Sequence, residues 1–209
     1  MKNKISWDDV TLLDYIHINE ILQTKELTDI EKEIELIKIL THNNNIDELS
    51  IDEFKKYTYV LNLLTTKIPH KAMKKEYEFL GKKWIVSDKI QKITTGQYID
   101  YTNLCQNQIG VNEVSKVIGY LLIPKDGKYN VGYDMDELCA AIEREIPITE
   151  AYGFADFFVE AQMKLFHHLR VYLTKEAAKT TASMETKIEL AKNLYNLERE
   201  LKQVWRNMD

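Results

Sequence analysis

Apolar residues recur at three- and four-residue spacings in the first third of the chain, a pattern typical of helices with one buried face. Each such segment opens with a serine or threonine followed three residues later by an acid, a pair that caps helix amino termini. The pairs are Thr11 with Asp14, Thr28 with Glu31, and Ser50 with Glu53; the apolar stripes are Leu12, Ile16 and Leu22, then Ile30, Ile34, Ile37 and Leu40, then Phe54, Tyr57, Leu61 and Leu64. The pattern predicts three short amphipathic helices that form a small bundle.

The period changes after Pro69, which ends the third of these helices. Residues 77–86 have strand-like composition on both sides of a central glycine, and they predict a β-hairpin. A lone hairpin is marginally stable in water. We therefore expect Tyr77, Phe79 and Trp84 to pack on a helix or to extend a sheet in a partner.

Helical spacing returns from Thr95 onward and predicts four further segments. The first passes through Tyr98, Tyr101 and Leu104, and the second runs from Val114 to Leu122 into a turn at Pro124 to Gly127. The third starts near Asp134 and ends at Ile146-Pro147. The fourth is opened by Thr149 and Glu150 and runs from Ala151 to about Leu173. The predicted fold class is mainly α: a helical bundle with a small β-hairpin and a C-terminal amphipathic helix. We divide the chain into a helical section 1–70, a hairpin and helical section 71–180, and a terminal helix 181–209.

The terminal segment has leucines at four- and three-residue spacing, close to a coiled-coil seam. The seam covers only about two heptads, which is short for a coiled coil. It can therefore pack on its own domain or on a partner, and both alternatives stay open. If the chain itself does not cover them, these side chains form the candidate partner-binding surface: Leu190, Leu194, Leu197, Leu201, Val204 and Trp205.

Composition agrees with a globular helical protein, because 44% of residues are apolar, 29% are charged, and only 7 are glycine and 3 proline. The net charge of −5 gives no sign of nucleic-acid binding. Charge is unevenly distributed, since residues 1–66 hold 7 Lys/Arg against 13 Asp/Glu and residues 67–92 hold 8 against 3. The basic segment 67–92 is either a patch for an anionic partner or a solvated hairpin face that balances the acidic helices; the second interpretation is favoured.

Residues that could carry chemistry do not form a recognisable motif. Cys105 and Cys139 lack paired metal-ligand spacing, and the adjacent His167 and His168 would point about 100° apart on a helix. The acids in 134–137 lack the glycine and glutamate spacing of an EF-hand, and helix capping explains them. With no phosphate loop and no nucleophile elbow, we expect no enzymatic activity, no catalytic residue, no metal and no cofactor.

The cysteine usage fits a reducing compartment. The amino terminus turns acidic before any apolar run, unlike a signal peptide, and no stretch approaches the 18 or so apolar residues of a membrane span. We therefore expect a cytosolic chain with no membrane partner.

Three short motifs carry a resemblance to a known group of proteins. They are the stretch from Ser6 to Leu12 before the first helix, the stretch from Thr95 to Asp100 after the hairpin, and Gly132-Tyr133-Asp134 before a later helix. With the order of elements over residues 5–175, they resemble small proteins encoded in the tail-module regions of Bacteroidetes phages, often labelled tail assembly chaperones.

The resemblance implies a non-enzymatic role: binding a virion protein such as the tape measure, or assisting polymerisation of the tail tube, in the host cytoplasm. A competing hypothesis is a structural virion component, such as a neck, ring or connector protein, that forms a homo-oligomer. A third is a nucleic-acid-associated role of the basic hairpin, and nucleic acid is the least expected partner.

Overall fold

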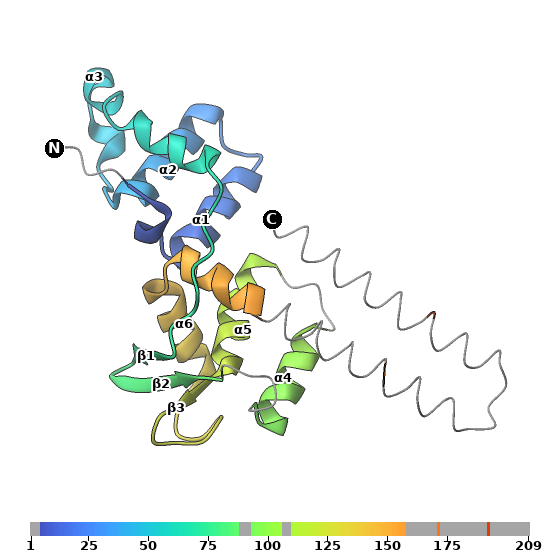
Figure 1. Ribbon diagram of the computed structural model, residues 1–209. Helices are drawn as coiled ribbons and strands as arrows, with labels where there is room; N and C mark the ends of the chain where they lie inside the picture. The colour runs from blue at the N-terminus through green and yellow to red at the C-terminus, as the bar shows by residue number, and fades with distance from the viewer. Residues whose placement is uncertain (1–4, 88–92, 106–109, 158–170, 172–191, 193–209) are drawn as a thin grey trace. The chain divides into compact units, whose positions relative to one another are not determined.

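Helices make up most of the described chain, with one small antiparallel sheet among them, as Figure 1 shows for this computed structural model. The structure describes residues 5–87, 93–105 and 110–157, together with Val171 and Lys192. The chain divides into two compact units, Met1–Phe154 and Ala155–Asp209. Residues on both sides of position 70 lie in the first unit, which contains the elements described below except residues 155–157 at the end of the last helix.

The first two predicted helices are confirmed, including their caps. A short 3-10 helix, η1 (Trp7–Asp9), precedes α1 (Leu12–Gln23) and α2 (Asp29–Thr41), and α1 packs on α2. The Thr11 hydroxyl accepts from the Asp14 N–H at 3.1 Å, and Thr28 caps α2 in the same way. Such reciprocal bonds satisfy backbone donors that a helix start leaves without partners.

The third helical segment is more broken than its periodicity predicts. It consists of α3 (Ile51–Phe54), a turn, and the 3-10 helix η3 (Thr58–Thr65), after a single 3-10 turn η2 (Ile46–Glu48). The Thr58 hydroxyl donates to the Lys55 carbonyl at 3.0 Å, a local bond that competes with α-helical pairing. Within η3, the buried residue is Val60, which lies outside the predicted stripe.

The predicted hairpin is confirmed and gains a third strand. Strands β1 (Glu76–Phe79), β2 (Lys82–Val86) and β3 (Leu122–Pro124) form an antiparallel sheet in the order β1-β2-β3. β2 pairs with β1 through Tyr77 opposite Trp84, and with β3 through Ile85 opposite Ile123. The prediction that a helix continues to Leu122 is wrong by one residue, and the segment after it is a strand rather than only a turn.

The remaining helices pack beside this sheet. They are α4 (Thr95–Cys105), a 3-10 turn η5 (Val111–Glu113), α5 (Val114–Leu121) and α6 (Met135–Glu145). α5 packs on α4 and on α6, and α6 also contacts α1 and β1. The fully buried core includes Trp84, Ile118, Leu138, Ile142 and Phe154.

The helix α6 ends before Ile146-Pro147, as predicted, and residues 148–157 are helical again. The rest of the helix predicted to reach Leu173 lies outside the described residues, apart from Val171. The terminal amphipathic helix 181–209 also falls there, with the exception of Lys192. Mainly α with a small β element is therefore the fold class of the described chain.

Candidate functional site

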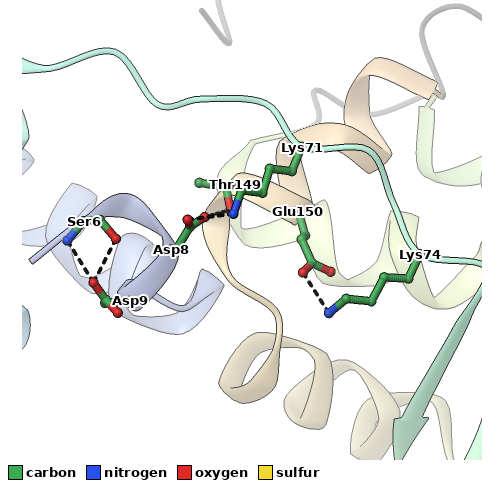
Figure 2. Close-up of polar contacts among 7 residues, drawn as sticks. All are labelled: Ser6, Asp8, Asp9, Lys71, Lys74, Thr149 and Glu150. Atoms are coloured by element: carbon green, nitrogen blue, oxygen red, sulfur yellow. Dashed lines mark hydrogen bonds and ion pairs between the residues drawn. The ribbon is translucent and has the colours of Figure 1, made fainter.

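Three segments that are distant in sequence meet within the first unit: residues 6–12, residues 70–77 and residues 146–154. Backbone hydrogen bonds join them, from Leu12 N–H to the Ile146 carbonyl at 2.9 Å and from Ile148 N–H to the Val10 carbonyl at 2.8 Å. The Lys71 N–H donates to the Thr149 carbonyl at 2.9 Å. Polar side chains of the same segments gather at this meeting point (Figure 2). We call Asp8, Lys71, Lys74, Thr149 and Glu150 the clasp.

Asp8 binds two of the other clasp residues with its two carboxylate oxygens. Its Oδ2 accepts from the Lys71 ammonium at 2.6 Å, and its Oδ1 accepts from the Thr149 hydroxyl at 2.7 Å. The hydrogen bond from Lys71, followed by that from Thr149, holds the pKa of Asp8 below its usual range. Asp8 is therefore ionised at neutral pH and joins all three segments.

Glu150 forms the second half of the clasp and is largely buried, with 8% of its surface exposed. Its carboxylate accepts from Lys74 at 2.8 Å and from the Tyr77 hydroxyl at 3.0 Å. The Tyr77 hydroxyl in turn accepts from the Lys74 N–H at 2.9 Å. Burial, with a smaller contribution from Glu150, raises the pKa of Tyr77, so this hydroxyl keeps its proton and donates it to the carboxylate.

A glycine allows the segment 70–77 to lie close against the helix 148–157. A Cβ added at Gly153 would come within 3.0 Å of the Lys71 carbonyl carbon and closer still to its oxygen. Aromatic side chains pack around the crossing, with the ring of Tyr152 at 4.9 Å from His70 and at 6.2 Å from Tyr15. The clasp is thus supported by close backbone packing and by ring contacts.

The contacts of the clasp join parts of the fold that are distant in sequence. Asp8 and Glu150 already accept hydrogen bonds from lysines and hydroxyls, and these contacts hold segments together across large sequence separations. Among the described residues, no group of three or more His, Cys, Asp or Glu side chains could hold a metal ion. The clasp therefore joins three segments of the first unit, although its exposed Lys71–Asp8 ion pair contributes little by itself, as exposed pairs generally do.

A second polar cluster joins α4 to α5 and to the loop before α6. The Tyr129 hydroxyl donates to Asp100 at 2.7 Å, and the buried Gln97 amide donates to the Tyr120 carbonyl at 2.7 Å. Burial first, then Asp100, raises the pKa of Tyr129, which keeps the hydroxyl protonated. Nearby on α6, burial raises the pKa of the Cys139 thiol to about 11, so it is mostly protonated at neutral pH.

Lysines of the basic segment 67–92 bond to other parts of the fold. Lys71 and Lys74 bind Asp8 and Glu150, and the Lys82 ammonium donates to the Gly132 carbonyl at 2.9 Å. Asp8 belongs to the acidic first third of the chain. Lys71 thus offsets one acid of the acidic first third, while the partners of Lys74 and Lys82 lie outside it, and the interpretation that the basic segment balances the acidic helices stays a prediction.

The structure does not describe the candidate partner-binding residues of the terminal segment. Leu190, Leu194, Leu197, Leu201, Val204 and Trp205 all lie outside the described residues, and their role stays a prediction. The described chain instead exposes apolar side chains on two predicted stripes: Leu22 is 52% exposed and Ile30 is 53% exposed. Their predicted core positions are wrong, because the two residues lie at the α1–α2 connection, where the described chain does not cover them.

In the described part of the chain, no helix is long and apolar enough to cross a lipid bilayer. Comparison of the chain with known protein families, with curated proteins and with solved structures finds no match.

Proposed function

We propose that this chain has a non-enzymatic, protein-binding role in assembly of a bacteriophage tail, as a tail assembly chaperone in the host cytoplasm. The observation that carries the protein-binding part is the exposure of Leu22 and Ile30. Both continue apolar helix stripes, yet each is more than half exposed. The Lys32 ammonium donates to the Leu22 carbonyl at 3.4 Å, so the end of α1 lies beside the start of α2. A partner that covers this end would bury both side chains.

The environment of the carboxylates and of the buried thiol supports a binding role over catalysis. The clasp carboxylates of Asp8 and Glu150 are bound by lysines, and the buried thiol of Cys139 has a raised pKa. Catalytic acids, bases and nucleophiles instead need reactive groups that reach a substrate. The phage-tail part of the proposal rests on the resemblance of the three motifs. Each of them precedes or opens a helix here, namely α1, α4 and α6.

Affinity capture of the full chain from the cells that make it tests the proposal. We expect tail proteins among the captured partners, identified by mass spectrometry. The variant with Leu22→Asp and Ile30→Asp should lose them, because a charge at each site opposes burial. Ile51→Asp is the matched control, since Ile51 is 74% exposed and an acid at the start of α3 is well tolerated. Capture of no virion protein by the unaltered chain would contradict the proposal.

Mass in solution separates the chaperone from the structural component. Size-exclusion chromatography with light scattering is applied to the full chain and to a chain truncated after Lys179. Monomers in both forms, with no chain in purified particles, support a chaperone. A multimer that becomes monomeric on truncation, with the chain present in particles, would support a neck, ring or connector protein instead.

A further inference from the structure

The two edges of the sheet differ in the backbone groups that they offer. In an antiparallel pair, residues alternate between those that bond to the neighbouring strand and those whose N–H and C=O point away from it. The Val86 N–H donates to the Lys75 carbonyl at 3.0 Å, so Tyr77 and Phe79 are the β1 residues that bond to β2. The N–H and C=O groups of Glu76 and Glu78 therefore point to the outer edge of β1.

The β3 edge is closed to an added strand. Lys125 N–H donates to the Lys83 carbonyl at 2.8 Å, and Ser87 N–H donates to the Leu121 carbonyl at 3.0 Å. By the same alternation, Leu122 and Pro124 carry the outward groups of β3. Proline has no N–H, and the Leu122 N–H already donates to the Gly119 carbonyl. Hence only the β1 edge offers both donors and acceptors.

The charge along the β1 edge selects what can pair with it. Glu76 and Glu78 are exposed on the same face of the strand, while Phe79 on the other face is buried and Tyr77 is half-buried. A second copy of β1 in antiparallel pairing would place glutamates opposite glutamates, which is unfavourable. Each glutamate has a cation of the sheet beside it, since Glu76 binds Lys125 at 3.1 Å and Glu78 lies opposite Lys83 on β2, but these groups are solvent-exposed, and such pairs contribute little.

We propose that the β1 edge binds an extended segment of a partner protein in which basic and apolar residues alternate, added as an antiparallel fourth strand. The basic side chains lie opposite Glu76 and Glu78, and the apolar ones lie beside Tyr77 and Phe79. Backbone hydrogen bonds supply affinity and the alternating side chains supply specificity. The inference deepens the proposed function, on which it rests, by naming a second binding surface besides Leu22 and Ile30 and the chemistry of the segment bound there.

A labelled peptide in which lysine alternates with valine tests the inference by fluorescence anisotropy with the full chain. In antiparallel pairing, the lysines opposite the glutamates are the residues that bond to β1. We therefore expect N-methylation of the lysines to abolish binding and N-methylation of the valines to preserve it. No binding of the parent peptide, or any other pattern between the two methylated peptides, overturns the proposal.

Glu78→Pro is the matched protein variant. The Glu78 N–H does not bond to β2, so proline there should leave the hairpin folded, as proline is tolerated on edge strands. Circular dichroism and the urea midpoint check that the fold is kept. We expect Glu78→Pro to lose peptide binding and Glu78→Gln, which keeps the N–H, to weaken it by up to about ten-fold. The proposal is overturned if the Glu78→Pro variant is folded and binds the peptide as tightly as the unaltered chain does.

Capture from cells keeps this inference distinct from the proposed function. If the unaltered chain and Glu78→Pro retain the same tail proteins equally, the β1 edge is not the binding surface and the proposed function stands. If the peptide pattern holds but the unaltered chain retains no virion protein, the proposed function fails and the edge is a binding surface for another class of protein.

Discussion

The substitution Gly153→Ala tests the close crossing of residues 71–73 over the helix 148–157. In an exposed helix this change is favourable, because alanine is a better helix former than glycine by about 1 kcal/mol. At this position the new methyl group would overlap the Lys71 carbonyl. Backbone is harder to displace than the end of a flexible side chain, so the segment 70–77 must move away from the helix.

The expected cost follows from what that movement breaks. Overpacking of a well-packed site costs about 1–3 kcal/mol. Loss of the backbone bond between Lys71 and Thr149 costs about 1 kcal/mol more. Against the gain of about 1 kcal/mol in helix propensity, the net effect is a destabilisation of about 2 kcal/mol. The sign is thus opposite to the one that helix propensity alone would give.

Urea denaturation followed by tryptophan fluorescence measures this difference. Gly119→Ala is the control, because its added Cβ would meet the Met135 sulfur at 3.0 Å, in a flexible side chain that can move. We expect Gly119→Ala to change stability by less than about 1 kcal/mol. A Gly153→Ala variant as stable as the unaltered chain, or more stable, would refute the close crossing.

Three further results are expected. Leu80→Asn should raise the urea midpoint by the equivalent of about 0.5–1 kcal/mol, because Leu80 is left-handed at φ 54 in the hairpin turn; a lower midpoint would contradict this. Asp8, whose folded pKa is depressed by Lys71, stabilises the fold above its unfolded pKa of about 3.9, and this contribution disappears as pH falls through the lower folded value. The free energy of unfolding that Asp8→Asn loses should therefore be constant near neutral pH and become smaller in acid. An equal loss at neutral and at acidic pH would count against the contact between Asp8 and Lys71. Cys139, studied in a Cys105→Ser background, should react with a thiol reagent at mildly alkaline pH only as fast as the fold opens; rapid reaction like that of a free thiol would show that it is not buried.

Local signals in the sequence predicted the helix starts well. The pairs opened by Thr11, Thr28 and Ser50 form reciprocal caps in the structure. A capping box involves residues only three positions apart, so its signal does not depend on the rest of the fold. The stop before Pro147 is likewise local, because proline restricts the residue before it.

The third strand could not be read from local pattern. Leu122, Ile123 and Pro124 continue the apolar run of α5, and a short apolar run does not distinguish a buried helix from a strand. Their pairing with β2 is decided by residues about forty positions earlier in the chain. The proline, which would argue against a central strand, is acceptable here because β3 is an edge.

The clasp was missed for the same physical reason. Asp8 is separated by 63 positions from Lys71 and by 141 from Thr149, so no periodicity or spacing links them. One signal was present, since an isolated glycine weakens a helix and can have a packing reason there. Gly153 is such a residue, but only the structure shows that the approaching backbone belongs to Lys71.

The clasp also changes how the uneven charge of the chain bears on its partners. Lys71 and Lys74, from the basic segment, bind Asp8 and Glu150. The positive charge of these two lysines is therefore neutralised by carboxylates of the same chain. An anionic partner would have to compete with carboxylates that are already in place, at 2.6 and 2.8 Å. Backbone groups at the β1 edge and apolar side chains at the α1–α2 connection face no such competitor in the described chain. Binding through the apolar side chains at the α1–α2 connection should therefore depend only weakly on salt, whereas binding that uses charges, either lysines opposite Glu76 and Glu78 or phosphate contacts, should weaken as salt rises.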